Sequence, residues 1–209
     1  MSSIMVGIPT FDGSVKSRTA ESVGNAIDHA EDAGLLDKVV HRYPGGYDVA
    51  RARNFMARWA LEEKVDYLLM VDSDMVLPRD AISCLMRDDV DVALGFAVRG
   101  TSDAGDTAIV KSWSHDNSDT FSTDDFRKLR EDGTDVVEVR RGGMACALIK
   151  TRVFSRVKKP WFYYQENSDG SALSEDYWFC RQCQNAGVKV FVDARVGCGH
   201  IKERTLEAM

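Results

Sequence analysis

The stretch DYLLMVDSDM, residues 66–75, decides how the rest of the chain is interpreted. Its apolar run, 67–71, has the length and composition of a buried strand. Two carboxylates follow, Asp72 and Asp74, with Ser73 between them. Side chains two residues apart on an extended backbone point the same way, so both carboxylates can converge beyond the end of the strand. Two like charges that close repel each other unless a positive charge lies between them.

A divalent cation would relieve this repulsion between Asp72 and Asp74. Mg²⁺ and Mn²⁺ prefer carboxylate oxygen, so the spacing predicts a metal site at the end of the strand. The alternative is an ordinary polar turn, because aspartate and serine favour turns by bonding to their own backbone. The two carboxylates alone do not decide between these interpretations.

The composition is that of an ordinary globular protein. The chain has 209 residues, 44% of them hydrophobic and 29% charged, which predicts a single domain with a sizeable core. A net charge of -6 argues against a broad nucleic-acid-binding face. No apolar run is long enough for a transmembrane helix, and the N-terminus lacks the features of a signal peptide. We therefore expect a cytoplasmic protein without a membrane span.

The cysteines fit the same compartment. The chain has five cysteines, an odd number, and they are scattered along it, which is typical of reduced thiols rather than of a disulfide framework. The pair Cys180 and Cys183 has the spacing of a zinc or redox motif, but it lies in a predicted helix without a second Cys/His pair. We interpret the two residues as small side chains packed on one helix face.

Strands and helices alternate through the first part of the chain. The predicted strands are 4–8, 38–43, 67–71 and 90–96, and the predicted helices are 17–33, 49–63 (capped by Asp48) and a third that begins at Pro78. This pattern predicts an α/β fold with a central, mostly parallel sheet flanked by helices. Because such folds bind ligands at the C-terminal ends of their strands, we expect Thr10, Asp12, Asp72 and Asp74 to share one crevice.

The second part is less regular. Its predicted strands are 107–113, 136–139, 145–149 and 188–192, its helices are 124–131, 151–157 and 175–186 (capped by Ser174), and its loops are 99–106, 114–123, 140–143 and 158–169. The first loop is expected to close over a ligand. The last carries the aromatic run 161–164, which either forms the floor of a binding site or packs in the core.

Two further features carry candidate chemistry. Glu175 and Asp176 open the helix 175–186, where the helix dipole favours carboxylates, and a carboxylate there can also act as a general base. His200 follows a glycine-rich turn. A lone histidine is more often structural than a ligand, but here it could complete a metal site with Asp72 and Asp74.

Several segments, in this order, resemble glycosyltransferases of the GT-A fold, close to family 2. The matching segments are 6–10 (VGIPT), 50–54 (ARARN), 69–74 (LMVDSD), 142–149 (GGMACALI), 174–181 (SEDYWFCR), 185–190 (NAGVKV) and His200. The resemblance covers residues 4–201. It implies a Rossmann-like nucleotide-diphospho-sugar transferase fold, with 1–98 as the nucleotide-binding half and 99–209 as the acceptor-binding half of a single domain.

The resemblance also implies an activity. Such an enzyme moves a sugar from a nucleotide-sugar donor, a UDP- or GDP-sugar, to an acceptor hydroxyl, and needs Mn²⁺ or Mg²⁺. Asp72, Asp74 and His200 would hold the metal. Asp176 would be the acceptor base if the reaction inverts, with Glu175 beside it; the sequence does not decide between inversion and retention. The residues expected to contact the nucleotide are Pro9, Thr10, Asp12, Arg53, Asp72 and Ser73.

The chain departs from the family at one position. The strand 38–43 ends in Arg42 and Tyr43 rather than in the aspartate that many relatives use to bind uracil, which leaves the base open. The acceptor is also open: a protein, a glycan, a small molecule or a modified nucleobase. One alternative is a sugar-nucleotide pyrophosphorylase, although residues 8–12 lack the glycine-rich basic loop of those enzymes. Another is a catalytically inactive nucleotide-sugar-binding module, against which the intact acidic residues weigh.

Overall fold

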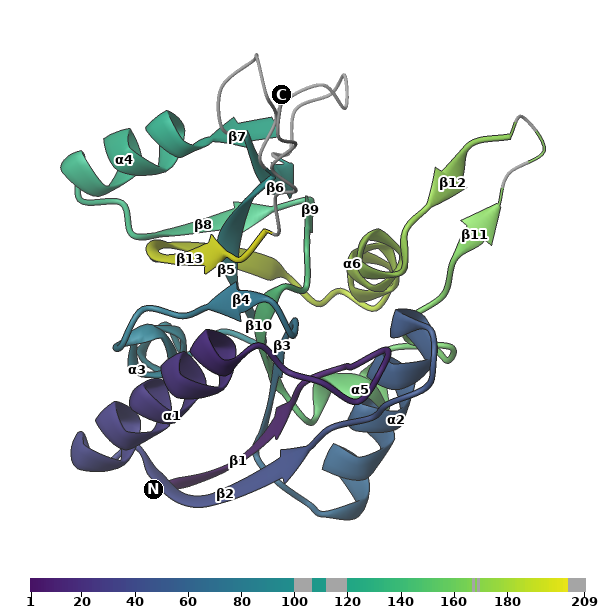
Figure 1. The fold of residues 1–209 in the computed structure, drawn as a ribbon. Coiled ribbons are helices and arrows are strands. Elements are labelled where there is room, and N and C mark those ends of the chain that lie inside the picture. The colour runs from purple at the N-terminus through teal and green to yellow at the C-terminus, as the bar shows by residue number, and fades with distance from the viewer. Residues whose placement is uncertain (100–106, 112–119, 167, 169, 203–209) are drawn as a thin grey trace, which may run out of the picture.

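A twisted β-sheet runs through the molecule, and helices cover both of its faces (Figure 1). The computed structural model describes residues 1–99, 107–111, 120–166, 168 and 170–202. The strands are β1 (Ser2–Gly7), β2 (Leu36–Arg42), β3 (Tyr67–Val71), β4 (Met75–Val76), β5 (Val92–Arg99), β6 (Thr107–Lys111), β7 (Thr120–Ser122), β8 (Val136–Val139), β9 (Arg141–Gly142), β10 (Cys146–Lys150), β11 (Gln165–Glu166), β12 (Ala172–Leu173) and β13 (Val190–His200). The helices are α1 (Ser17–Asp32), α2 (Val49–Glu62), α3 (Ala81–Arg87), α4 (Thr123–Glu131), α5 (Val153–Arg156) and α6 (Glu175–Asn185).

The strand order places the acidic stretch at the centre of the sheet. Along the main path the order is β2-β1-β3-β10-β5-β13-β4. The strands β2, β1, β3, β5 and β13 run in the same direction, and β10 runs against its neighbours β3 and β5. The predicted α/β fold with a mostly parallel central sheet is therefore confirmed. Strands from the two parts of the chain alternate across it, since β10 and β13 flank β5.

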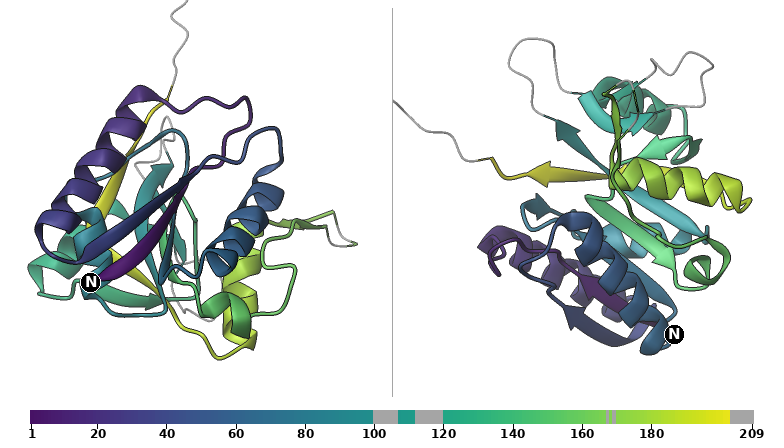
Figure 2. Two further views of the ribbon diagram at one scale, coloured as in Figure 1. Left: turned by 90° about the horizontal axis from the view of Figure 1, so that it is seen from below. Right: turned by 90° about the vertical axis from the view of Figure 1, so that its right-hand side faces the viewer.

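Each face of the sheet has its own hydrophobic core. The stripe of α1, including Val23 and Ile27, packs with α3 on one face. The apolar side of α2, including Met56, packs with Phe154 of α5 and Phe179 of α6 on the other. Figure 2 shows α1 and α2 on opposite sides of the strands. This arrangement follows from the sequence because the buried strand β3 is apolar on both sides.

Local signals in the sequence fix two helix starts. The carboxylate of Asp48 accepts a hydrogen bond from the backbone N–H of Arg51 at 2.9 Å, which confirms the predicted cap of α2. Ser122 and Asp125 form a reciprocal capping box at the start of α4. Ser174 precedes α6 as predicted, but its hydroxyl donates to Asp176 instead of capping the helix backbone.

Several predicted boundaries were wrong. The helix expected at Pro78 begins at Ala81, after a turn in which the Ala81 N–H donates to the Pro78 carbonyl. Parts of the loops expected at 140–143 and 158–169 form the short strands β9 and β11. The segment 120–122, expected as loop, is strand β7. The remainder of the loop 114–123, and residues 100–106 of the loop expected to close over a ligand, lie outside the described residues.

The largest difference is at β13, which continues to His200 instead of ending at 192. Its pairing with β5 shifts register between Val192 and Gly197, then resumes, and its end pairs with β4. The sequence pattern hid this extension because charged residues and glycines interrupt the apolar run. In the part of the chain that the structure describes, no helix has the length and apolar character needed to cross a bilayer.

Candidate functional site

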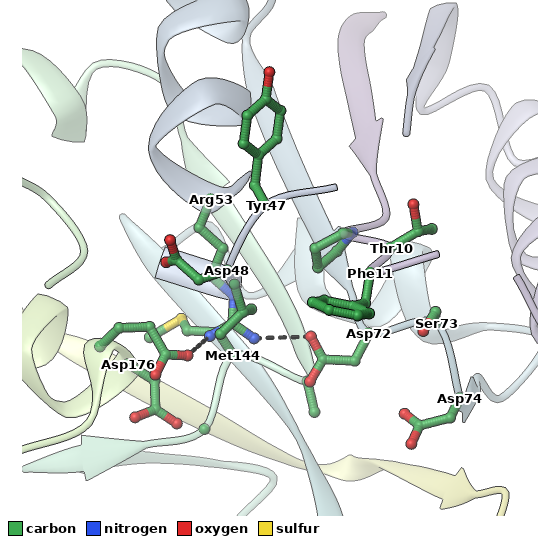
Figure 3. Close-up of a pocket in the computed structure, with 15 residues that line it drawn as sticks. Thr10, Phe11, Tyr47, Asp48, Arg53, Asp72, Ser73, Asp74, Met144 and Asp176 are labelled. Atoms are coloured by element: carbon green, nitrogen blue, oxygen red, sulfur yellow. Dashed lines mark hydrogen bonds and ion pairs between the residues drawn. The ribbon is translucent and has the colours of Figure 1, made fainter. Parts of the chain in front are cut away.

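A cavity of about 410 Å³ opens where β1 and β3 end (Figure 3). The segments after β1 and β3, the start of α2, the segment before β10 and the start of α6 together form its walls. The lining residues are Pro9, Thr10, Phe11, Tyr47, Asp48, Val49, Arg53, Asp72, Ser73, Asp74, Gly143, Met144, Ala145, Glu175 and Asp176. Most of the residues predicted for the site therefore line one cavity.

One wall is a pair of loops that continue the pairing of β1 with β2. The Thr10 N–H donates to the Pro44 carbonyl at 3.0 Å, and the Gly46 N–H donates to the Phe11 carbonyl at 3.1 Å. These bonds fix the backbone of both loops. Phe11 nevertheless has 84% of its surface exposed, and Tyr47 from the second loop is also exposed. Two aromatic rings thus stand at the mouth of the cavity on an ordered backbone.

The acidic turn after β3 separates its two carboxylates. The Asp72 N–H donates to the Ala145 carbonyl at 3.0 Å, and the Met75 N–H closes the turn on the Asp72 carbonyl at 3.1 Å. The side chain of Asp72 accepts a hydrogen bond from Arg53 at 2.8 Å. The side chain of Asp74 points elsewhere, with Oδ2 lying 3.0 Å from Nε2 of His200. The structure thus joins Asp74 to His200 and Asp72 to Arg53.

The pair Asp74 and His200 is the part of the predicted metal site that the structure brings together. Among the described residues, no group of three or more His, Cys, Asp or Glu side chains is arranged to hold a metal ion. A carboxylate oxygen and an imidazole nitrogen are both acceptable donors for Mn²⁺. Ions of this kind are often held by one or two protein ligands, with water and substrate phosphates filling the other positions. The donor pair fits such an ion.

Arg53 is buried beneath the cavity between two acids (Figure 3). Its side chain is 3% exposed and donates to Asp72 and to Glu175. Burial acts to lower the pKa of Arg53, but the neighbouring carboxylates Asp72 and Glu175 outweigh it and raise that pKa. A guanidinium suits this place because it donates in several directions and stays charged. Arg53, predicted to contact nucleotide, is held by protein carboxylates in this structure.

Glu175 and Asp176 have different surroundings at the start of α6. Glu175 has a side chain only 8% exposed, bonded to Arg53, and the Tyr164 hydroxyl also hydrogen-bonds to it. Burial raises the pKa of Glu175, and Arg53 opposes that rise. Asp176 lines the cavity, and its Oδ1 accepts hydrogen bonds from the Ser174 hydroxyl and from the Tyr177 N–H. Of the two carboxylates, Asp176 is the more accessible to an incoming molecule.

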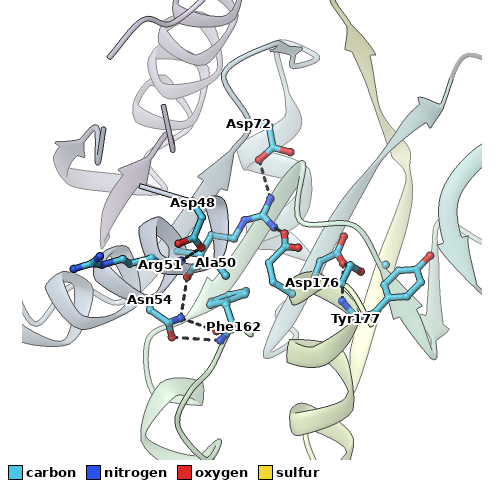
Figure 4. Close-up of polar contacts among 12 residues, drawn as sticks. Asp48, Ala50, Arg51, Asn54, Asp72, Phe162, Asp176 and Tyr177 are labelled. Carbon is cyan, nitrogen blue, oxygen red and sulfur yellow. Dashed lines mark hydrogen bonds and ion pairs between the residues drawn. The ribbon is translucent and has the colours of Figure 1, made fainter. Parts of the chain in front are cut away.

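Asn54 links α2 to the aromatic segment 161–164 (Figure 4). Its Nδ2 donates to the carbonyls of Ala50 and Phe162 at 2.8 and 2.7 Å, and its Oδ1 accepts from two backbone N–H groups of the segment. Trp161 and Phe162 are buried in the core, whereas Tyr163 and Tyr164 are exposed. The first two residues of the run therefore pack in the core, and the binding-site role considered for Tyr163 and Tyr164 stays a prediction. Asn54 lies within the segment 50–54 that resembles the GT-A family, but the sequence pattern did not predict that it anchors the segment 161–164.

Asp12 lies apart from the other predicted nucleotide ligands. Its carboxylate accepts hydrogen bonds from the N–H and hydroxyl of Ser14, at 2.9 and 2.6 Å. These bonds from Ser14 lower the pKa of Asp12. The side chain is exposed and does not line the cavity as described above. Its expected contact with a nucleotide stays a prediction.

Comparison with known proteins identifies the fold. No protein-family model matches the chain, and no curated protein matches it. The crystal structure of A197 from STIV matches with a TM-score of 0.58 and 18% identity, over 96% of this chain and 86% of that one. The crystal structure of GalNAc-T7 with UDP, GalNAc and Mn²⁺ matches with a TM-score of 0.60 and 14% identity, over 97% of this chain and 44% of that one. The chain therefore has a GT-A-like fold, and it spans less than half of the GalNAc-T7 chain.

Proposed function

We propose that this protein is a metal-dependent glycosyltransferase that moves a sugar from a nucleotide-sugar to an acceptor hydroxyl, with inversion. One observation carries the proposal: a single cavity has Asp74, paired with His200, on one wall and Asp176 on another. Metal-dependent, inverting sugar transfer uses a cation site for the leaving diphosphate and a base for the acceptor. The shared fold with GalNAc-T7, solved with UDP and Mn²⁺, supports the nucleotide-sugar and metal parts of this proposal.

Asp74 and His200 would hold the metal. A bound Mn²⁺ or Mg²⁺ neutralises the negative charge that builds up on a departing diphosphate. Asp72 is held by Arg53 and faces the same cavity, so it would contact the donor beside the metal. The loop that holds Asp74 is fixed through its backbone, since the Ile201 N–H donates to the Asp74 carbonyl at 2.8 Å. Fixed donors of this kind favour binding because little order is lost when the ligand arrives.

Phe11 and Tyr47 would hold the nucleobase. Both rings are exposed at the mouth of the cavity, on loops fastened to each other by backbone hydrogen bonds. Every nucleobase has a flat face that stacks on aromatic side chains, so such rings bind bases with little discrimination. This arrangement suits a chain in which Arg42 and Tyr43 replace the aspartate expected to bind uracil.

Asp176 would act as the base. The acceptor oxygen attacks the anomeric carbon, the bond from that carbon to the diphosphate oxygen breaks, and the acceptor proton passes to the Asp176 carboxylate. Asp176 suits this role better than Glu175, because Glu175 is nearly buried and already bonded to Arg53 and Tyr164. We expect Asp176→Asn to keep donor binding and to lower transfer by about 10²-fold or more. Loss of donor binding in Asp176→Asn, measured by calorimetry, would contradict the assignment.

A thermal-shift panel of nucleotide-sugars tests the proposal. The full chain is heated with each UDP- and GDP-sugar in the presence of Mn²⁺, Mg²⁺ or EDTA. A donor at about ten times its Kd adds roughly 1.4 kcal/mol of stability, which is roughly 3–5 °C in a chain of this size. We expect at least one donor to shift the melting temperature with metal and not with EDTA, and Asp74→Ala to abolish the shift. If the wild type responds to no donor, the proposed function is wrong.

A further inference from the structure

Two buried hydroxyl groups lie at the start of the otherwise apolar face of α1, near the cavity. The buried face begins with Thr19 and Ser22, and its remaining members are Val23, Ala26, Ile27 and Ala30. Thr19 is 0% exposed. A hydroxyl among apolar side chains is costly unless it makes hydrogen bonds, so its partners show why it is tolerated.

Both hydroxyls bond to the segment that carries Asp74. The Thr19 hydroxyl donates to the Ser73 carbonyl at 3.1 Å, and that carbonyl also accepts the Lys16 N–H at 3.1 Å. The Leu77 N–H donates to the Ser22 hydroxyl at 3.1 Å, and the same hydroxyl donates to the Thr19 carbonyl at 2.9 Å. The segment 73–77 is therefore fastened to α1 on both sides of Asp74 and β4.

β13 holds the same segment from the opposite side. His200 pairs with Met75 in the short ladder between β13 and β4, and the Ile201 N–H bonds to the Asp74 carbonyl. α1 and β4 lie next to each other in the fold (Figure 1). The backbone around Asp74 is thus held by α1 on one side and by the end of β13 on the other.

We propose that Thr19 is a positioning residue, which directs the Asp74 carboxylate toward His200 by holding the Ser73 carbonyl. Ser22 holds the other end of the segment. This inference rests on the proposed function, because it is the metal site at Asp74 and His200 that requires the fixed geometry. Without the Thr19 hydroxyl, the Ser73 carbonyl keeps the bond from Lys16 but loses its attachment to the interior of α1. The turn would then sample orientations in which Asp74 and His200 do not converge.

The chain offers closely matched variants. Thr19→Val exchanges the hydroxyl for a methyl group of similar size, whereas Thr19→Ser keeps the hydroxyl. Thr151→Val is the control, because the Thr151 hydroxyl is buried and has no hydrogen-bond partner among the described residues. Thr151 follows β10 beside Asp66, at the end of β3 remote from the cavity. The same exchange there removes no contact with the site.

Two measurements test the proposal. The Kd of Mn²⁺ alone is measured by electron paramagnetic resonance of the free ion. We expect Thr19→Val to raise that Kd by about fivefold to tenfold, and Thr19→Ser and Thr151→Val to stay within about twofold of wild type. Hydrogen exchange, followed by mass spectrometry without added ligand, should show faster exchange over 73–77 in Thr19→Val and unchanged exchange in β1 and β3.

The outcomes separate the two proposals. If the wild type binds Mn²⁺ and Thr19→Val binds it equally well, the positioning role is overturned and the proposed function stands. If exchange accelerates throughout Thr19→Val, the hydroxyl serves general stability and the positioning role is again overturned. If the wild type binds neither Mn²⁺ nor any donor, the proposed function fails, and the positioning role fails with it.

Discussion

Arg53 connects the two carboxylate-bearing walls of the cavity through one buried guanidinium. It bonds to Asp72 after β3 and to Glu175 at the start of α6. The spacing of Asp72 and Asp74 predicted two carboxylates that share a cation. The structure instead gives each a different partner, Arg53 and His200. Sequence spacing could not reveal this, because Arg53 lies 19 residues before Asp72 and reaches it only through the packing of α2 on β3.

We expect Arg53→Met to destabilise the protein by about 3–5 kcal/mol, because it leaves the buried Glu175 without a counter-charge. The free energy of unfolding is measured by urea denaturation. The double variant Arg53→Met/Glu175→Met should regain part of the loss, since no uncompensated charge is left at that position. Arg58→Met is the control, because Arg58 lies exposed on the same helix. A double variant less stable than Arg53→Met would contradict this explanation of the network.

At the scale of elements, the sequence predicted the helices and strands whose signals are local. The cap Asp48, the apolar run of β3 and the stripe of α1 each lie within the element they define. The end of β13 was missed because its pairing is not local. Asp193 and Arg195 are compatible with a buried strand because they pair with each other, and Arg195 also pairs with Asp88, which follows α3. That partnership depends on contacts between distant parts of the chain.

Gly95 lets β5 and β13 approach each other beside the register shift. A Cβ at this position would lie 2.8 Å from Val196 Cγ1 and 3.0 Å from the Val196 carbonyl oxygen. Because a backbone atom cannot rotate away, we expect Gly95→Ala to cost about 1–3 kcal/mol in the free energy of unfolding. Gly24→Ala on α1 is the control: no heavy atom of the described residues lies within 4 Å, so alanine should stabilise the helix by about 0.5–1 kcal/mol. Equal effects of the two variants would refute the close approach as the cause.

For the whole molecule, a buried acid cluster sets a dependence of stability on pH. Asp88 and Asp193 have side chains only 2% and 0% exposed, and both bond to Arg195, at 2.6 and 2.8 Å. Burial and the nearby Asp193 raise the pKa of Asp88 from 3.8 to about 7. The folded state therefore binds a proton at Asp88 that the unfolded state has already released. This contribution to stability is complete below pH ~4 and is lost as the pH rises through ~7.

We expect the free energy of unfolding to fall by roughly 1 kcal/mol per pH unit between pH 4 and 7 through this group. Asp88→Asn keeps the shape of the protonated acid and cannot ionise. The free energy of unfolding of this variant should fall less steeply over that range, so that its stability relative to the wild type increases as the pH rises. Urea denaturation of both proteins at several pH values measures the difference. Parallel pH profiles would mean that Asp88 does not titrate in this range.

The sequence predicted the GT-A-like fold of the whole molecule better than it predicted the geometry of the site. The matching segments occur along the chain in the same order as in the family. The resemblance therefore predicted how the strands are connected. It could not show that Asp12 bonds to Ser14 outside the cavity, or that Thr19 and Ser22 hold the acidic turn. These contacts depend on side-chain directions that the order of segments does not specify.

In the proposed function, a metal ion and a nucleotide bind together at Asp74 and His200. The most direct measurement is an anomalous difference map from crystals grown with Mn²⁺ and the nucleoside diphosphate of the donor that stabilises the protein most. We predict a peak about 2.0–2.6 Å from an Asp74 carboxylate oxygen and from His200 Nε2, with the diphosphate beside it. A map with the nucleotide bound but no peak between these two side chains, or with the peak elsewhere, would contradict the account.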